Sequence, residues 1–205
     1  MHKRFVSIYF SASLACMIPF PGRFAYGLIL AVELFVLVFG ATLFRAAIGK
    51  LEFVHSGNLF FMVFVIFLTM LFRQILAALL PVAALSAGFA LYVPAISAFT
   101  AGFFSESEKE SGESILKRNV FYTAIFCAFV LVFFLLRDLV GFGTITYITA
   151  RGIAEKVLFD SERVAFASFF ATIPGVLLSL ALIAVVRAFI ASKSMREKKT
   201  EMNRD

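Results

Sequence analysis

The sequence has few of the residues on which metal and disulfide sites depend. Its 205 residues include only two cysteines and two histidines. Two cysteines far apart in a chain give no disulfide framework, and His2 and His55 form no metal-ligand cluster. A Walker loop and a dinucleotide fingerprint are also missing, because Gly141-Phe142-Gly143 is a lone GxG that follows no soluble strand. These absences argue against a nucleotide-binding or zinc-dependent soluble enzyme.

Charged residues are scarce and apolar residues abundant. Only 16% of the residues are charged, whereas 61% are hydrophobic and the mean hydropathy is +0.96. Soluble domains have about 45–50% apolar residues, so the composition predicts an integral membrane protein. The net charge of +6 does not indicate nucleic-acid binding, because lysine and arginine collect in the cytoplasmic loops of membrane proteins.

Six apolar segments follow one another along the chain. Membrane-spanning chains form helices or closed barrels, and these runs are too long for strands, so we expect six helices in one bundle. Between the last two, residues 141–163 are predicted to form a mostly polar loop with a short interfacial helix, and Pro174-Gly175 to kink the sixth span. The segments are residues 5–18, 24–48, 59–80, 82–104, 120–140 and 164–190.

The first and fourth segments are interrupted. The first runs for about fourteen residues before Pro19 and Pro21, too short for a span of about twenty. The fourth contains Gly88, Pro94 and Gly102. Interrupted helices in matching positions of two halves point to a site near the middle of the membrane. Cys16 lies almost at the end of the first helix.

The two halves of the chain share a short motif. FVLVF occurs at residues 35–39 and again at 129–133, each time in the helix after a broken one and followed by an arginine and a glycine. Because each half has three helices, the halves would be inverted in the membrane. The predicted units are 1–80, 81–191 and a charged tail at 192–205. Chance similarity between Phe- and Val-rich helices is the alternative.

The basic residues predict an orientation. With both termini in the cytoplasm, 13 of the 19 lysines and arginines lie on the cytoplasmic side. We therefore expect a multi-pass protein of a bacterial inner membrane with both termini cytoplasmic. A lipoprotein signal cleaved before Cys16 is an alternative interpretation of the N-terminus.

The second half of the chain carries a family resemblance. Leu136 to Ile145, LRDLVGFGTI, resembles a motif of one family of small membrane subunits. Members of that family occur in the Rnf electron-transport complex and in the sodium-translocating NADH:quinone reductase (NQR). Ala171 to Gly175 and the basic tail are similar to the same family. So are Leu14 to Pro19 and Tyr92 to Ile96, in matching order and spacing.

This resemblance implies a fold, partners and a cofactor. In that family two inverted three-helix repeats each open with a broken helix, and a cysteine at each break holds a [2Fe–2S] cluster shared with a homologous sister subunit. Cys16 matches the first cysteine, but Thr100 stands where the second is expected. The cluster is therefore expected to be poorly held or absent. We expect the tips carrying Cys16 and Thr100 to lie close together.

Other polar residues in the apolar segments are further candidates. Glu33 and Arg73 are predicted to pair with each other, to line a cation path, or to serve only in packing. Cys127 is predicted to be a packing residue. Within the family motif, we expect Arg137 and Asp138 to serve as interface anchors and a loop clamp, and Gly141 and Gly143, before Thr144, to cap the fifth helix and let the loop approach closely.

The sequence thus predicts a membrane subunit of an Rnf- or NQR-like redox complex that moves Na⁺ or H⁺. Its partners would be the lipid bilayer and other subunits, and it would itself be at most a non-catalytic part of the oxidoreductase. The alternative is a six-helix subunit of a transporter that binds a small molecule and has no redox role.

Overall fold

The computed structural model describes residues 9, 12–49, 57–106, 112–149, 152–159, 167–185 and 189. The described chain is mostly helical. Its longest helices are α2 (Phe24–Gly49), α3 (Gly57–Leu79) and α6 (Gly112–Phe142). The fourth apolar segment forms α4 (Pro81–Ala87), the 3₁₀ helix η1 (Gly88–Tyr92) and α5 (Pro94–Glu106).

Three or four of these elements are long and apolar enough to cross a membrane. The three continuous ones are Phe24–Ile48, Gly57–Leu79 and Glu113–Phe142, and the bent pair Pro81–Tyr92 with Pro94–Ala101 makes a possible fourth. Many large apolar side chains of α3 and α6 are exposed, as expected for helices that face lipid or another subunit. The prediction of a helical, membrane-embedded protein is thereby confirmed, whereas six spans are not.

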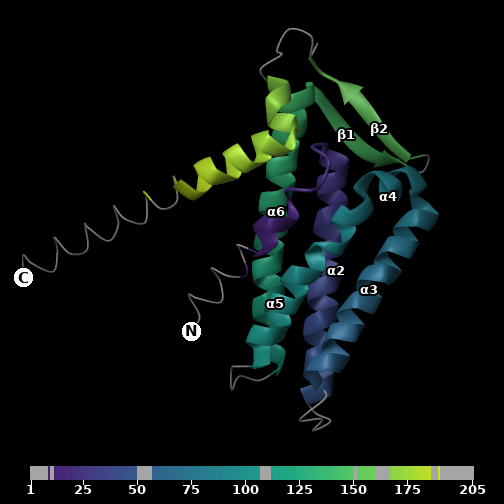
Figure 1. Ribbon diagram of the computed structural model, residues 1–205, viewed down its shortest axis with the longest axis vertical. Helices are drawn as coiled ribbons and strands as arrows, with labels where there is room; N and C mark the ends of the chain where they lie inside the picture. The colour runs from purple at the N-terminus through teal and green to yellow at the C-terminus, as the bar shows by residue number, and fades with distance from the viewer. Residues whose placement is uncertain are drawn as a thin grey trace, which may run out of the picture.

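Helix α2 is the centre of the bundle. It packs against α6 on one side and α3 on the other, and α5 also contacts it (Figure 1). Glycines permit these close approaches: a Cβ atom at Gly27 would lie 2.6 Å from the Cβ of Phe134 on α6. Small residues at such contacts are typical of membrane helix pairs, where backbone approach replaces a hydrophobic driving force.

The fourth segment is broken, as predicted. Gly88 has φ +49°, which residues with a side chain rarely adopt, and it ends α4. Pro94 lacks a backbone donor and begins α5. The two parts of the segment meet at an angle of 43°.

The first segment is also interrupted before it could cross a membrane. Residues 12–16 are helical, and the chain then leaves the helix at Met17 and runs irregularly to Arg23. The turn is closed by short-range bonds from Met17 N to Leu14 O and from Ile18 N to Ala15 O. The prolines that follow prevent a return to helix.

The predicted loop with an interfacial helix after α6 is wrong. The chain instead forms an antiparallel hairpin of β1 (Thr144–Thr149) and β2 (Gly152–Val157), which lies at one end of the bundle (Figure 1). Threonine, isoleucine and tyrosine dominate β1, and these residues favour strands. Their alternation was too short to stand out beside long apolar runs.

The predicted sixth span, with a kink at Pro174-Gly175, is also wrong in its described part. A 3₁₀ helix, η3 (Ala167–Ala171), is followed by a separate apolar helix, Ile173–Val185. Thr172 caps that helix by accepting a hydrogen bond from Gly175 N. Pro174 therefore lies in the first turn, where its missing donor costs nothing. Ile173–Val185 leaves the bundle obliquely (Figure 1).

Candidate functional site

The two interrupted segments meet at Cys16. Its thiol lies 3.5 Å from the carbonyl oxygen of Val93, at the break before α5, and 3.4 Å from the hydroxyl of Ser97, one turn into α5. The hydroxyl of Ser13 donates to that of Ser97 at 3.1 Å. Cys16, Ser13 and Ser97 have no exposed surface. The sequence argument for a site between two broken helices thus corresponds to a real contact.

The residue opposite Cys16 is Ser97, which the sequence analysis did not single out. The expected partner, Thr100, lies one helical turn, about 5 Å, further along α5. Its hydroxyl donates to the Ile96 carbonyl of its own helix at 2.8 Å, and its side chain is partly exposed. The contact with Cys16 is therefore made by Ser97 and not by Thr100.

The residues around Cys16 do not fit a [2Fe–2S] cluster. Such a cluster is normally held by four thiolates, and this junction offers one thiol, fully covered by hydroxyl and carbonyl groups. The other cysteine, Cys127, lies between α6 and α2 and donates to the Ala31 carbonyl, which is consistent with its predicted packing role. Among the described residues, no group of three or more His, Cys, Asp or Glu could hold a metal ion.

A file of buried polar groups continues from this junction toward the far end of the bundle. Ser13 interacts with Tyr9, whose hydroxyl lies 2.7 Å from that of Thr123 on α6. Thr123 donates to the carbonyl of Asn119, and the Asn119 amide donates to Thr42 on α2 at 3.2 Å. These side chains have at most 2% of their surface exposed. Buried polar side chains in four different elements are thus joined into one network, here called the polar file: Cys16, Ser97, Ser13, Tyr9, Thr123, Asn119 and Thr42.

Glu33 lies on α2 with none of its surface exposed, and neither carboxyl oxygen has a hydrogen-bond partner among the residues that the structure describes. It is close enough to Cys16 for the two groups to interact electrostatically. The predicted pairing with Arg73 is wrong. Arg73 is exposed on α3 and lies over the ring of Tyr92, with its guanidinium carbon 5.9 Å from the ring centroid.

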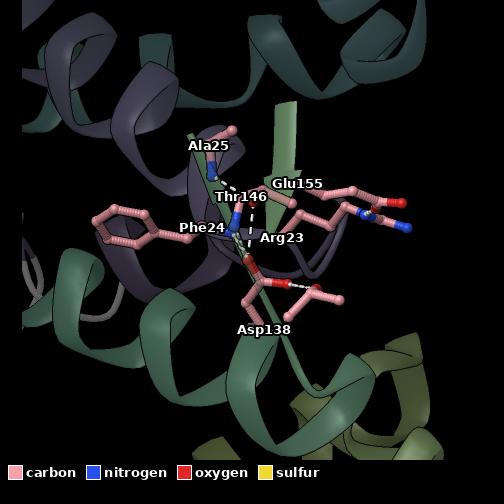
Figure 2. Close-up of polar contacts among 7 residues, drawn as sticks. Arg23, Phe24, Ala25, Asp138, Thr146 and Glu155 are labelled. Carbon is pink, nitrogen blue, oxygen red and sulfur yellow. Dashed lines mark hydrogen bonds and ion pairs between the residues drawn. The ribbon is translucent and has the colours of Figure 1, made fainter. Parts of the chain in front are cut away.

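At the hairpin end of the bundle, Asp138 holds three elements together (Figure 2). Its buried carboxylate accepts hydrogen bonds from Phe24 N at the start of α2, from Thr146 N and Oγ1, and from Thr144 Oγ1, at 2.7 to 3.1 Å. Thr146 Oγ1 in turn accepts from Ala25 N. Together they cap α2, whose first amides have no partner within the helix.

Its neighbour Arg137 points elsewhere and binds two backbone carbonyls. The guanidinium donates to Phe20 O in the first segment at 3.1 Å and to Ala171 O in η3 at 2.7 Å. The absence of side chains at Gly22 and Gly141 leaves space for these contacts. A Cβ at Gly22 would lie 2.7 Å from Arg137 Nε, and one at Gly141 would lie 2.7 Å from Ala171 Cβ. The loop clamp predicted for Arg137 and Asp138 is confirmed.

Gly143 ends α6 as the sequence predicted. Its φ of +66° and the hydrogen bond from its N–H to the Leu139 carbonyl are those of a left-handed helix cap. Its carbonyl accepts from the amides of Leu158 and Phe159, which closes the hairpin onto the helix end. Arg137, Asp138 and Gly143 thus have structural roles at this end of the bundle.

No protein-family model, curated protein or solved structure matches this chain. The geometry itself divides the polar residues by role. Asp138, and Arg137 through its two terminal nitrogens, form hydrogen bonds to the chain and hold it in shape. Glu33 and Cys16 lie inside the apolar part of the bundle, where an ionisable group is a functional candidate.

Proposed function

We propose that this chain is a membrane subunit of an ion-motive electron-transport complex of the Rnf or NQR type, paired with a homologous sister subunit. The observation that carries the proposal is the meeting of two interrupted helices at Cys16, whose thiol lies 3.4 Å from Ser97 Oγ. Interrupted helices that meet inside a membrane bundle mark binding sites in proteins built from inverted repeats.

The proposed architecture is two inverted three-helix halves. The support is that the first and fourth segments both break, that their breaks contact each other, and that each is followed directly by a long apolar helix or segment in the chain. The FVLVF copies lie in α2 and α6, the two helices in contact at the centre of the bundle. An orientation with both termini in the cytoplasm of a bacterial inner membrane belongs to the same proposal.

The proposal assigns no electron-transfer step to this chain, because the residues at Cys16 do not fit an iron–sulfur cluster on their own. A sister subunit that supplied further thiolates would have to move the hydroxyls of Ser13 and Ser97 away from Cys16. What the described residues do offer is a scaffold with buried polar groups, which suits ion movement coupled to a redox partner.

Affinity purification of the tagged chain from its native membrane tests the proposal. We expect co-purification of a homologous six-helix subunit, together with flavin- or iron-carrying subunits identified by mass spectrometry. Iron per complex is measured for the wild type and for Cys16→Ala, with Cys127→Ala as the matched control. A chain that purifies with an ATPase pair would instead support the transporter alternative and contradict the redox role.

A further inference from the structure

Glu33 is the buried group that the scaffold does not explain. It lies nine residues into α2, about 14 Å from the helix start. Its side chain has no exposed surface, and both carboxyl oxygens have no hydrogen-bond partner within the described part of the chain. Asp138, the other fully buried carboxylate of the described residues, accepts four hydrogen bonds. The two buried acids thus differ in whether neighbouring groups are present to stabilise a negative charge.

An ionised carboxylate without a partner is costly inside a protein. The effective penalty is several kcal/mol per ion even after relaxation, and such a group neutralises by taking up a proton. The other buried titratable groups of the described core are Cys16 and Tyr9 from the first segment, Tyr26 from α2, and Arg137 and Asp138 at the hairpin end. Cys127 on α6 is half-buried. The described buried residues of α3 and α5 include no titratable side chain. Because no cation of the described chain faces Glu33, its neutral form is favoured.

The polar file begins near Glu33, without a hydrogen bond to it, and runs toward one end of the bundle. Cys16 interacts electrostatically with Glu33 and contacts Ser97, which begins the polar file. The file passes through Ser13, Tyr9 and Thr123 to Asn119. Asn119 lies seven residues, about 10 Å, from the start of α6 at Gly112. From Cys16 to Thr123 the file consists of thiol and hydroxyl groups, which both donate and accept hydrogen bonds, as a proton route requires. Its last link runs from Thr123 to the backbone carbonyl of Asn119, which only accepts.

We propose that Glu33 is a proton-binding site inside the membrane, which exchanges its proton with the polar file when its side chain turns toward Cys16. In the step, the neutral carboxyl group releases H⁺ to the file and becomes a carboxylate, and reprotonation reverses this. No electron moves in the step. The inference rests on the proposed function and deepens it, because it identifies the transported ion as a proton. Na⁺ would need several oxygen ligands, and Glu33 has no polar partner among the described residues.

Infrared spectroscopy of the full chain, purified and placed in lipid vesicles without partners, tests this. A protonated carboxyl gives a C=O band distinct from that of a carboxylate, and D₂O shifts the band when the proton exchanges. We expect a band in the wild type that is absent in Glu33→Gln and present in the control Glu113→Gln, which changes an exposed acid. The wild-type band should shift within minutes of transfer to D₂O.

The polar file is tested by Tyr9→Phe, which removes one hydroxyl from its middle. We expect the D₂O shift to slow by about tenfold or more, which corresponds to an increase of about 1.4 kcal/mol in the activation free energy. The matched control is Tyr147→Phe on the exposed surface of the hairpin, which should exchange like the wild type.

Two results would overturn the inference: an acid band that survives in Glu33→Gln, or a wild-type band that stays unshifted in D₂O for hours. The second needs no variant, so a folding failure of Glu33→Gln leaves the test intact. Because the vesicles contain no partner subunit, this outcome is independent of the purification experiment. The infrared test can reject the proton site while the purification finds redox partners. Equally, the infrared test can support the proton site while the purification finds no redox partner.

Discussion

At the scale of single residues, the adjacent Arg137 and Asp138 show how a buried charge is tolerated near the end of a membrane helix. They do not neutralise each other. Arg137 binds the carbonyls of Phe20 and Ala171, whereas Asp138 binds amides and hydroxyls at the start of α2 and in β1. Each charge therefore meets backbone groups of opposite polarity that have no partner of their own. Two side chains thus fix the first segment, the hairpin and η3 against α6.

Replacing Asp138 with alanine should destabilise the protein strongly. The change removes four hydrogen bonds and leaves the amides of Phe24 and Thr146 buried without an acceptor. Removing one partner from a buried charged network costs about 3–5 kcal/mol. The free energy of unfolding in detergent can be followed with a thiol-reactive dye, because Cys16 is buried and Cys127 is half-buried in the folded chain.

Glu113→Ala is the control for Asp138→Ala. Glu113 is exposed and pairs with Lys117 one turn away on α6, and such surface pairs contribute about 0–1 kcal/mol. We expect its unfolding curve to coincide with that of the wild type. If Asp138→Ala also unfolds like the wild type, the carboxylate does not cap α2 as described.

The residue-level prediction succeeded where local signals sufficed. A motif of Arg-Asp followed by two glycines at the end of an apolar run indicates a clamp and a helix cap, and both are present. The contact of Ser97 with Cys16 could not be predicted, because it depends on the rotation of α5 after the Pro94 break. The partners of Glu33 and Arg73 depend in the same way on which face each helix turns inward.

At the scale of elements, the contact between α2 and α6 depends on a missing side chain. Gly27→Ala should destabilise the protein by about 1–3 kcal/mol, as overpacking does. A Cβ there would lie 2.6 Å from Phe134 Cβ, an atom fixed to its backbone. The clash outweighs the gain of about 1 kcal/mol in helix propensity. Thermal unfolding by the thiol dye measures the change.

Gly40→Ala is the matched control for Gly27→Ala in the same helix. Its Cβ would lie equally close, at 2.6 Å, but to Leu68 Cδ2, the tip of a flexible side chain. Leu68 can turn aside, so we expect a change near zero or a small gain in stability. Equal destabilisation by both substitutions would show that the α2–α6 contact is no tighter than the α2–α3 contact.

The meeting of the two interrupted segments can be tested by cross-linking. In a Cys127→Ala background, Ser97→Cys should form a disulfide with Cys16 on mild oxidation, because the present Oγ to Sγ distance is 3.4 Å. The loss of alkylatable thiols, measured by mass spectrometry, reports the bond. Thr100→Cys should stay mostly reduced, since the Thr100 hydroxyl bonds its own helix at Ile96.

The reverse result, with Thr100→Cys oxidised and Ser97→Cys reduced, would mean that α5 is rotated by about a sixth of a turn and shifted by about 4.5 Å along its axis from the arrangement described here. It would also restore the position at which the family resemblance expects a cysteine. Both variants carry the same number of thiols, so each is the control for the other.

The element boundaries could be predicted where proline or a long apolar run sets them. The breaks at Pro19 and Pro94, and the helices α2, α3 and α6, follow from the sequence. The hairpin did not, because six residues of β1 carry a weak signal and its partner Gly152–Val157 is only half apolar. Residues 164–190 were predicted as one helix because their apolar residues continue from η3 into Ile173–Val185. Periodicity alone does not reveal where the second helix starts.

At the scale of the whole molecule, the two ends of the bundle differ. The hairpin end is closed by the Arg137 and Asp138 contacts and carries the Arg23–Glu155 ion pair (Figure 2). The polar file runs toward the opposite end, where α2 ends and α6 begins, and stops at Asn119, about 10 Å from the start of α6. The orientation proposed above places this second end on the cytoplasmic side. The proposed proton site would then open to the cytoplasmic side.

Single cysteines can test this orientation in a background without Cys16 and Cys127. Lys156→Cys on the hairpin should react with a membrane-impermeant maleimide added to intact cells. Lys117→Cys, near the start of α6, should react only after the membrane is opened. Both lysines are exposed in the structure, so access is limited by the membrane and not by the protein.

Reporter fusions after Arg4 and after Lys199 complete the test, and both should give a cytoplasmic signal. The expectation rests on 13 of 19 basic residues lying on that side, each favouring the cytoplasmic face. Termini on opposite sides would mean an odd number of crossings and would contradict two inverted three-helix halves.

Labelling of Lys117→Cys from outside, with Lys156→Cys protected, would show that the bundle has the opposite orientation in the membrane. The polar file would then open to the exterior, and Glu33 would take its proton from there.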